Sequence, residues 1–391
     1  YARIASVPAP NPNGIGYAWI ECGPVNVDKH IHQIIVKDEV ELRSHIERIT
    51  LNPLKNPKLP KWEMYCLRNE GEGRSAIIAR MDHVIGDGLS FASAFMGMTT
   101  DMNGKAVPVP EPFRRREKSF LPSISSLGKL ITGVLDVLYL PIAPRDSVTV
   151  FRPSGQFGES GSRERTIVTL PPLDLHMVKS IKTKANVTVN DVLMAAFAGA
   201  VKRYIDIVDP DSRQKNGPLR MRALMPVAFP RKRLTGDRHF AEGVANKWSF
   251  ASLPLAVGGD VSRKERLEAT NRATSYLKNS PAVFMQKVLQ DILYHAVPLS
   301  VSQHMCADLM GKHSICISNV PGPQQALAVA GEEVVGVEVV FPNVLPQVNL
   351  FSYNGKIYGN MVVDSVSVPS PELISSLFKE EVHRLKFAVG A

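Results

Sequence analysis

The pattern of apolar and polar residues in the first hundred positions predicts strands that alternate with helices. Leu42, Ile46 and Ile49 recur at helical spacing, so we expect an amphipathic helix around them. Runs rich in apolar and β-branched residues, bounded by glycine as at 69–73, favour strands. The expected strands cover residues 28–37, 62–68 and 74–81, and the expected helices cover residues 38–50 and 89–99.

The same alternation resumes after residue 165. Asn354-Gly355, between two apolar runs, is a strong signal for a two-residue hairpin turn. Thr188 or Asn190 is suited to cap the helix that follows it. Strands are expected at residues 166–170, 221–229, 248–255, 334–341, 348–353 and 356–363, and helices at 173–184, 189–204, 265–278, 283–295 and 372–386. Strands that alternate with helices in both halves predict two similar α/β domains.

A proline-rich, basic segment at residues 103–125 separates the two halves and leads into an apolar stretch at 121–144. Lys129 and Asp136 interrupt this stretch, whereas a membrane span needs about 20 mostly apolar residues. An amphipathic helix that packs on the protein or lies in a membrane interface is therefore favoured over a span. We expect an N-terminal domain, a linker with its apolar segment, and a C-terminal domain, at residues 1–102, 103–164 and 165–391.

Composition narrows the classes of partner. The 391 residues are 44% hydrophobic and 21% charged, which is typical of a globular chain of two domains. The net charge of +9 suggests a phosphate-bearing cosubstrate or an anionic membrane surface, with a solvated basic surface as the alternative. No basic stretch interleaved with aromatic residues is present, so nucleic acid is not an expected partner. The four cysteines are scattered, which predicts neither a metal site nor a disulfide framework and favours a reducing compartment.

The segment Met81–Gly88 holds the first candidate for acid–base chemistry. His83 follows a predicted strand, and Asp87 and Gly88 complete the spacing His-x-x-x-Asp-Gly. Because histidine titrates near neutrality, His83 could take a proton from a hydroxyl group. This spacing also arises by chance, and taken alone it favours a hydrogen-bonded structural histidine.

Four further segments place this loop in a larger pattern. They read Leu-Pro-Lys-Trp-Glu at 59–63, Val-Thr-Val-Asn-Asp-Val-Leu at 187–193, Ser-Asn-Val-Pro-Gly-Pro at 318–323 and Ser-Tyr-Asn-Gly at 352–355. In this order they resemble the wax ester synthase/diacylglycerol acyltransferase family of coenzyme A-dependent acyltransferases, and the last two are the more specific. The resemblance implies two α/β domains like chloramphenicol acetyltransferase, with mixed sheets and a substrate tunnel between them. Family members usually begin with additional sequence, so a truncated N-terminus is expected.

The resemblance implies a reaction as well as a fold. His83 would be the general base that deprotonates a long-chain alcohol or diacylglycerol, whose oxygen attacks the thioester carbonyl of acyl-CoA. Acyl-CoA would be a cosubstrate, and neither a bound cofactor nor a metal is implied. The products would be wax ester, triacylglycerol or both. Association with a membrane or lipid-droplet surface on the cytoplasmic side is implied too, at the endoplasmic reticulum in a eukaryote.

Other residues receive roles by the same resemblance. Asp82, Asp87 and Gly88 would support the loop. Asn190 and Asp191 would lie at the active-site interface, unless they only cap their helix. The tunnel wall would include Ser318, Asn319, Pro321 and Gly322. The basic run Arg231, Lys232 and Arg233 could bind the CoA phosphates, with a solvated loop as the alternative.

Asp82 departs from the family pattern, which has a first histidine there. A neighbouring carboxylate is expected to raise the pKa of His83 and shift activity to higher pH. Two rival functions stay open: another enzyme of the superfamily, such as a condensation domain or a plant-type acyltransferase, and a non-catalytic lipid-binding relative. The Asp-Phe-Gly-Trp-Gly segment of plant-type enzymes is absent here, and condensation domains rarely carry the last two motifs.

Overall fold

The chain folds into two compact units in a computed structural model. The structure describes residues 2–11, 17–54, 56, 58–107, 124–154, 164–212, 217–229 and 245–391. The first unit comprises Tyr1–Thr100, Ala106–Arg114 and Ala228–Lys247, and the second comprises Asp101–Lys105, Arg115–Val227 and Trp248–Ala391. A segment from the second half of the sequence therefore belongs to the first unit.

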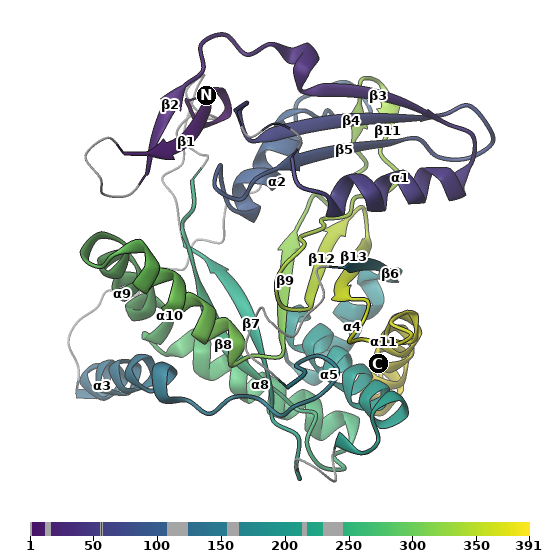
Figure 1. Ribbon diagram of the computed structural model, residues 1–391. Helices are drawn as coiled ribbons and strands as arrows, with labels where there is room; N and C mark the ends of the chain where they lie inside the picture. Colours follow the sequence, from purple (N-terminus) through teal and green to yellow (C-terminus); the bar gives the residue numbers. More distant parts are fainter. Residues whose placement is uncertain are drawn as a thin grey trace. The chain divides into compact units, whose positions relative to one another are not determined.

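The first unit is built on a three-stranded sheet in the order β3-β4-β5, with α1 against it (Figure 1). β3 pairs with β4 in parallel, and β4 pairs with β5 in antiparallel orientation. Asp38 begins α1 by accepting a 2.8 Å hydrogen bond from Glu41 N. Alternate strand residues face α1 and make a small core of Val36, Leu42, Ile49, Tyr65 and Leu67. The bounds are Ile31–Val36 for β3, Glu39–Leu51 for α1, Trp62–Asn69 for β4 and Ala76–Met81 for β5.

Shorter elements complete this unit. An antiparallel hairpin that the pattern did not predict lies near the N-terminus, where Pro8 and Pro10 weaken the strand signal. Helix α2 follows the His83 loop, as expected. The bounds are Ala2–Ala5 for η1, Ser6–Pro10 for β1, Tyr17–Glu21 for β2, Val27–Lys29 for η2 and Gly88–Gly97 for α2.

The second unit is built on a mixed six-stranded sheet in the order β6-β13-β12-β9-β7-β8. β12 pairs in parallel with β9 and in antiparallel orientation with β13, which in turn pairs with β6. Asn354 and Gly355 form the turn between β12 and β13 with φ of 44° and 73°, so the predicted hairpin is confirmed. The strands are Arg165–Asp174 (β6), Met221–Ala228 (β7), Trp248–Leu255 (β8), Ile315–Pro321 (β9), Gln347–Tyr353 (β12) and Lys356–Asp364 (β13), with a short pair at Ala328–Val329 (β10) and Glu332–Glu333 (β11).

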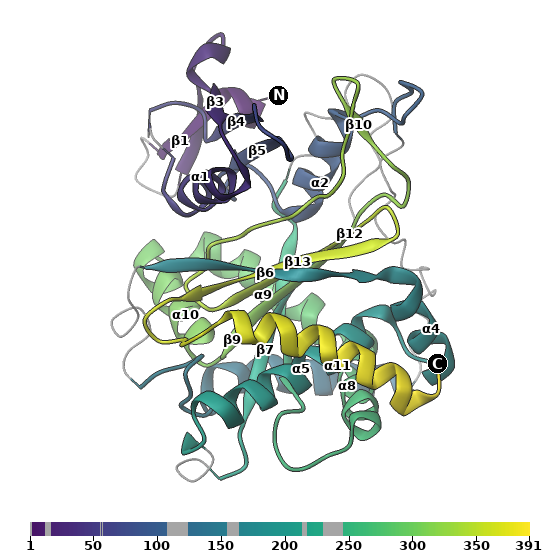
Figure 2. The ribbon, with the colours of Figure 1, turned by 90° about the vertical axis from the view of Figure 1, so that its right-hand side faces the viewer.

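Helices α4, α5 and α11 cover one face of this sheet, and α8 packs on α5 (Figure 2). Val348 and Leu350 of β12 point into the main core, which these helices share. The buried carboxylate of Glu381 ties the helices together, because it lies 3.1 Å from Arg203 and 2.9 Å from Arg263. The bounds are Leu175–Ala185 for α4, Val189–Val208 for α5, Arg263–Asn279 for α8 and Glu372–Val389 for α11.

The apolar segment of the linker forms helix α3, which packs against α9. Gly133 permits a close approach, because a Cβ there would lie 2.6 Å from Pro281 Cγ. Among the described residues, no helix combines the length and apolarity that crossing a membrane would need. The bounds are Ile124–Tyr139 for α3, Leu140–Ile142 for η3, Ala282–Ala296 for α9 and Leu299–Gly311 for α10, which the pattern did not predict.

The expected strand at residues 334–341 is wrong. The segment has no regular secondary structure, and it directly follows the short strand β11. Side chains of β13 bind its backbone instead: Asn360 Nδ2 donates to Val339 O at 3.1 Å, and Tyr358 Oη donates to Val335 O at 2.9 Å. The alternating valines are typical of a strand, but hydrogen bonds from side chains outside the segment determine the backbone conformation here. Within the described residues the two main sheets differ in size, with three strands in the first unit and six in the second.

Candidate functional site

His83 lies in the loop between β5 and α2, as the pattern predicted. Asp82 N donates to Lys61 O at 2.9 Å, which continues the contact between β4 and β5 to the start of the loop. Asp82 Oδ1 then accepts a 2.9 Å hydrogen bond from Val84 N, and Ile85 N donates to Asp82 O at 3.0 Å. The side chain of Asp82 therefore shapes the turn that presents His83.

Three consecutive backbone carbonyl groups of this loop accept hydrogen bonds from distant side chains. Asn246 Nδ2 donates to His83 O at 2.7 Å and to Val84 O at 3.2 Å. Arg3 Nη1 donates to Ile85 O at 3.2 Å. Neither Arg3 nor Asn246 belongs to a recognisable motif, and the sequence carries no local signal that they meet this loop. The backbone of the loop is thus held by two side chains, one that precedes the loop in the sequence and one that follows it.

Asp87 supports the loop from its other end. Its carboxylate is 3% exposed, and its Oδ1 accepts a 3.2 Å hydrogen bond from Ser90 N, which caps α2. The second oxygen, Oδ2, accepts a 3.0 Å hydrogen bond from Lys247 N. Gly88 is the first residue of the helix that Asp87 caps. Both carboxylate oxygens therefore accept hydrogen bonds from backbone N–H groups, as expected for a residue that supports the loop.

The imidazole of His83 is mostly buried, and this lowers its pKa from the ordinary value. Burial disfavours the charged form, and it outweighs opposing contributions from the His83 backbone carbonyl, the carboxylates of Asp87 and Asp82, and the side chain of Asn246. Phe91 adds an apolar edge at 6.1 Å between ring centroids. The expected rise in the pKa of His83 is therefore wrong, because the pKa falls overall. The contribution of Asp82 by itself does raise it, as expected. His83 is neutral at pH 7 and able to accept a proton.

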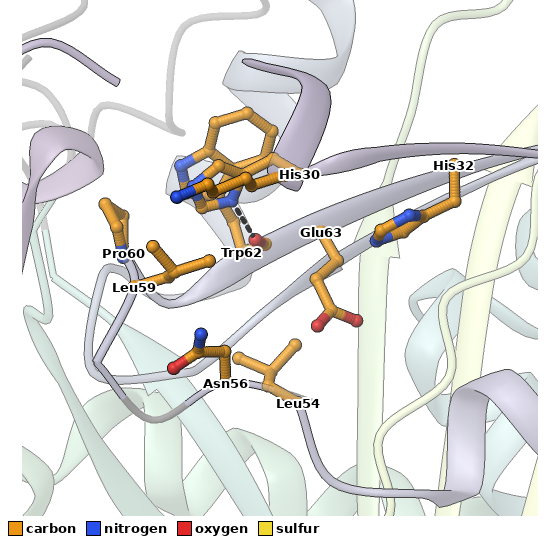
Figure 3. A pocket seen from close by; sticks show the side chains of 9 residues that line it. His30, His32, Leu54, Asn56, Leu59, Pro60, Trp62 and Glu63 are labelled. Carbon is orange, nitrogen blue, oxygen red and sulfur yellow. Dashed lines mark hydrogen bonds between the residues drawn. The ribbon is translucent and has the colours of Figure 1, made fainter. Parts of the chain in front are cut away.

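The segment 59–63 forms one side of a small pocket in the first unit (Figure 3). His30 stacks on Trp62 at 4.3 Å between centroids and donates from Nδ1 to Trp62 O at 2.7 Å. Glu63 accepts hydrogen bonds from Tyr65 at 2.9 Å and from Arg80 at 3.1 Å. This part of the motif thus anchors the beginning of β4. The pocket is lined by Lys29, His30, His32, Leu54, Asn56, Leu59, Pro60, Trp62 and Glu63.

Asp191 is fully buried and committed to structure at the start of α5. Thr188 is the N-cap, so Asn190 is not, and Asp191 completes a capping box by accepting from Thr188 N at 2.8 Å. Thr274 Oγ1 and Asn271 Nδ2 also donate to this carboxylate, at 2.5 Å and 2.9 Å. Burial alone would raise the pKa of Asp191, but the hydrogen bonds from Thr274, Thr188 and Asn271 together lower it. Asp191 therefore stays ionised as a structural anion.

Three of the sequence motifs meet in the second unit. Asn319 Nδ2 donates to Asn190 Oδ1 at 2.6 Å, which joins the end of β9 to the start of α5. Pro321 pairs with Ser352 in the register of β9 and β12. Gly322 N donates to Ser352 Oγ at 3.2 Å. Ser318 lies in the same strand, so the motif at 318–323 packs directly on the motif at 352–355.

The predicted residues fall into one cluster in each unit. His83, Asp82, Asp87 and Gly88 lie in the first, whereas Asn190, Asp191 and residues 318–322 lie in the second. Arg231, Lys232 and Arg233 lie outside the described residues. No cluster of three or more histidine, cysteine, aspartate or glutamate side chains suited to a metal ion occurs in the described part of the chain.

Family models match the segments that carry these motifs. Residues 8–193 match the wax ester synthase/diacylglycerol acyltransferase catalytic domain, and residues 244–386 match the C-terminal domain of the same family. The chain belongs to the wax ester synthase/diacylglycerol acyltransferase family. The first match contains the His83 loop and the second contains residues 318–323, so the resemblance of the motifs is confirmed. The protein is accordingly an acyltransferase.

Relatives and solved structures agree with this assignment. Wax ester synthase/diacylglycerol acyltransferase 9 of Arabidopsis thaliana is 24% identical over 422 residues, which cover 96% of this chain and 84% of the relative. Number 4 of the same plant is 20% identical over 432 residues, which cover 100% and 82%. The wax ester synthase/diacylglycerol acyltransferase of Marinobacter aquaeolei VT8 shares the fold with a TM-score of 0.65 at 16% identity, covering 100% of this chain and 87% of its own.

The fold extends beyond the wax ester synthase/diacylglycerol acyltransferase family. The first condensation domain of the calcium-dependent antibiotic synthetase matches 98% of this chain and 84% of its own, with a TM-score of 0.55 at 15% identity. At this identity the likeness concerns the fold alone. The expected α/β class with mixed sheets, like that of chloramphenicol acetyltransferase, is therefore confirmed.

Proposed function

We propose that this acyltransferase moves a fatty acyl group from acyl-CoA to the hydroxyl of a long-chain alcohol or of diacylglycerol. The products are a wax ester or a triacylglycerol. Membership of the family supports the substrate classes. The single observation that carries the mechanism is His83, a mostly buried, neutral imidazole on a loop whose backbone carbonyls are held by Asn246 and Arg3.

His83 acts as a general base in this proposal. In the neutral imidazole one ring nitrogen carries a proton and the other keeps its lone pair. That lone pair takes the proton of the acceptor hydroxyl while the oxygen attacks the thioester carbonyl. The tetrahedral intermediate collapses, the carbon–sulfur bond breaks, and the CoA thiolate leaves. The imidazolium returns its proton to the thiolate, so protons and charge balance without an acyl-enzyme.

An acceptor panel tests the reaction. Purified protein is given labelled acyl-CoA with either hexadecanol or diacylglycerol, and ester is measured. His83→Ala is expected to lower turnover by about 10²–10⁴, the range for a general base. The exposed His176, at the first turn of α4, provides the control His176→Ala, which should match the wild-type rate. Ester formation that survives His83→Ala unchanged would overturn the mechanism, and its absence in the wild type would favour a non-catalytic lipid-binding role.

We further propose that the basic run Arg231–Arg233 binds the phosphates of CoA. The net charge of +9 and the phosphate preference of guanidinium groups support this role. Replacing all three residues by alanine should raise the KM for acyl-CoA while leaving the KM for an acyl-N-acetylcysteamine thioester, which lacks the nucleotide, unchanged. Alanine at Lys179, Lys182 and Lys184, which are exposed on α4, is the matched control. An equal rise in KM for the two acyl donors would contradict the assignment of this run to the CoA phosphates.

The surface of α3, η3 and α9 is proposed to dock on a lipid membrane or droplet. Ile131, Leu135 and Leu138 recur at helical spacing on α3 and are exposed, and Ile142 of η3 continues the row at 77% exposure. The neighbouring helix α9 adds a second exposed apolar row, Phe284, Val288 and Ile292. Exposed apolar rows on adjacent amphipathic helices suit the boundary between lipid headgroups and acyl chains.

We place this contact on the cytoplasmic face of the membrane, at the endoplasmic reticulum in a eukaryotic cell. The four free cysteines agree with a reducing compartment. Flotation with liposomes of phosphatidylcholine and phosphatidylserine tests the surface: Leu138→Ser combined with Ile142→Ser should reduce the floating fraction. Phe387→Ser removes an equally exposed apolar side chain from α11 and should leave flotation unchanged. Equal flotation of both variants would remove the support for this surface.

A further inference from the structure

We propose that Asn246 is a positioning residue, which holds the His83 imidazole in its proton-accepting orientation and stabilises the imidazolium during turnover. The inference rests on the proposed role of His83 as the general base. One carboxamide nitrogen, Asn246 Nδ2, donates to His83 O at 2.7 Å and to Val84 O at 3.2 Å. Both amide protons are therefore used to fix the backbone from which the imidazole projects.

The same side chain also affects the charge state of the ring. The side chain of Asn246 is among the interactions that raise the pKa of His83, against the larger effect of burial. The side chain of Asn246 therefore favours imidazolium over the neutral ring. Because the base must become charged when it takes the substrate proton, this interaction strengthens along the reaction.

The backbone on either side of Asn246 keeps its side chain directed at the loop. Ser90 Oγ donates to Ala245 O at 3.0 Å and accepts from Ala245 N at 3.1 Å. On the other side, Lys247 N donates to Asp87 Oδ2 at 3.0 Å. The segment 245–247 is thus bound to the start of α2 at both of its ends. This explains why a residue 163 positions away reaches the His83 carbonyl reliably.

Other charged groups face the loop, and the experiment leaves them in place. Asp82 and Asp87 lie on the loop itself and both raise the pKa of His83. Arg3 approaches from η1 through Ile85 O, and Lys247 comes from the same segment as Asn246. Since none of these groups changes in an Asn246 variant, a shift of the pH profile reports the carboxamide.

Two variants of Asn246 are expected to move the pH profile in opposite directions. Asn246→Ala removes this interaction, so the acid limb of kcat/KM should move to lower pH while kcat falls by up to about 10²-fold, as misplacement of a base costs. Asn246→Asp places a carboxylate beside the ring, so the acid limb should move to higher pH. KM for both substrates should stay within twofold. Asn279→Ala, an exposed helix-end asparagine, is the matched control and should leave the profile unchanged.

A second measurement does not depend on turnover. Carbethoxylation of His83 by diethyl pyrocarbonate, mapped by peptide mass spectrometry across pH, should show the same opposite shifts. If Asn246→Ala fails to fold, Asn246→Asp and Asn246→Gln still provide the comparison, with the carboxylate moving the profile up and the longer amide moving it down. Unshifted profiles with only a lower melting temperature would overturn the inference. If the inference fails but the wild type is active and His83→Ala is inactive, the proposed function still holds. An inactive wild type would instead contradict the proposed function.

Discussion

Asn190 Oδ1 accepts a 2.6 Å hydrogen bond from Asn319 Nδ2, and this bond joins two sequence motifs that lie 129 residues apart. Asn190 stands at the start of α5, beside the capping box formed by Thr188 and Asp191. Asn319 stands in β9, two residues before the proline that pairs with β12. The two family motifs of the second unit are therefore parts of one hydrogen-bonded structure rather than separate features.

A double-mutant cycle measures this bond. Asn190→Ala and Asn319→Ala should each lower the free energy of unfolding, and the pair should lower it by less than the sum. The coupling is expected to be about 0.5–1.5 kcal/mol, the net worth of a partly buried hydrogen bond between neutral groups. Urea unfolding of the two single variants and the double variant gives the value. Strictly additive effects would show that the two amides do not stabilise one another.

Gly322 is predicted to be intolerant of alanine. A Cβ there would lie 2.4 Å from Phe351 Cε1 and 2.4 Å from Ser352 O, so the two motifs would have to separate. The cost should reach about 1–3 kcal/mol, typical of overpacking. The control is Gly128→Ala in α3, where nothing lies within 4 Å and alanine favours the helix. A melting temperature of Gly322→Ala equal to that of wild type would contradict the packing described here.

Asp82→Asn is predicted to shift the pH dependence of catalysis downward. The asparagine keeps an oxygen that accepts from Val84 N, so the turn survives, but the negative charge that raises the pKa of His83 is lost. In wild type the acid limb of kcat/KM should already lie below pH 6.5, because burial lowers this pKa. In the variant it should lie lower still.

Asp101 provides the control for this shift. Its Oδ1 accepts from Asn103 N at 2.8 Å in a similar turn, but Asp101 is not among the groups that shift the pKa of His83, so Asp101→Asn should leave the limb in place. Initial rates measured from pH 5 to pH 8 give the position of the acid limb in each protein. An acid limb that stays fixed in Asp82→Asn would mean that Asp82 has no electrostatic effect on the base.

His313 is predicted to make the second unit sensitive to acid. It is fully buried, donates from Nδ1 to Leu309 O at 2.7 Å and accepts from Ser252 Oγ at 2.8 Å. Burial is the main reason that its pKa falls to about 4. Between the unfolded pKa near 6.5 and pH 4, the unfolded chain binds a proton that the folded chain does not. Stability from this group is therefore fully present above pH 6.5 and is lost as pH falls toward 4, by about 3 kcal/mol.

His313→Gln separates this contribution from the other titrating groups. The amide is uncharged at every pH, so the fall in unfolding free energy between pH 7 and pH 4.5 should be smaller than in wild type. Urea unfolding followed by tryptophan fluorescence measures it. Equal pH slopes for the two proteins would show that His313 takes up its proton without opening the fold.

Most elements followed from local pattern, and the exceptions have physical causes. The strands and helices around residues 28–99 and 348–386 lie close to their expected bounds, because apolar periodicity and turn chemistry act within a few residues. The segment 334–341 carries the alternation of a strand, yet side chains of Tyr358 and Asn360 bind its backbone. A prediction from neighbouring residues cannot include hydrogen-bond donors that lie outside the segment.

The candidate site divides in the same way. His83 and Asp87 were recognisable by spacing, and the order of the motifs pointed to the family. The partners of the loop were not recognisable, since Arg3 and Asn246 reach it from 82 and 163 positions away. The carboxylate of Asp191, which the resemblance places at the active-site interface, accepts hydrogen bonds from Thr188, Asn271 and Thr274, and the last two lie outside its motif.

The sequence by itself determined which residue is the candidate base, which elements surround it and which family the chain belongs to. All of these depend on the identity and spacing of near neighbours. Only the tertiary structure decided the direction of the His83 pKa, because the carboxylate beside it is visible in the sequence but the burial that outweighs it is not. Desolvation depends on everything packed around a group, and that packing is assembled from residues far apart in the chain.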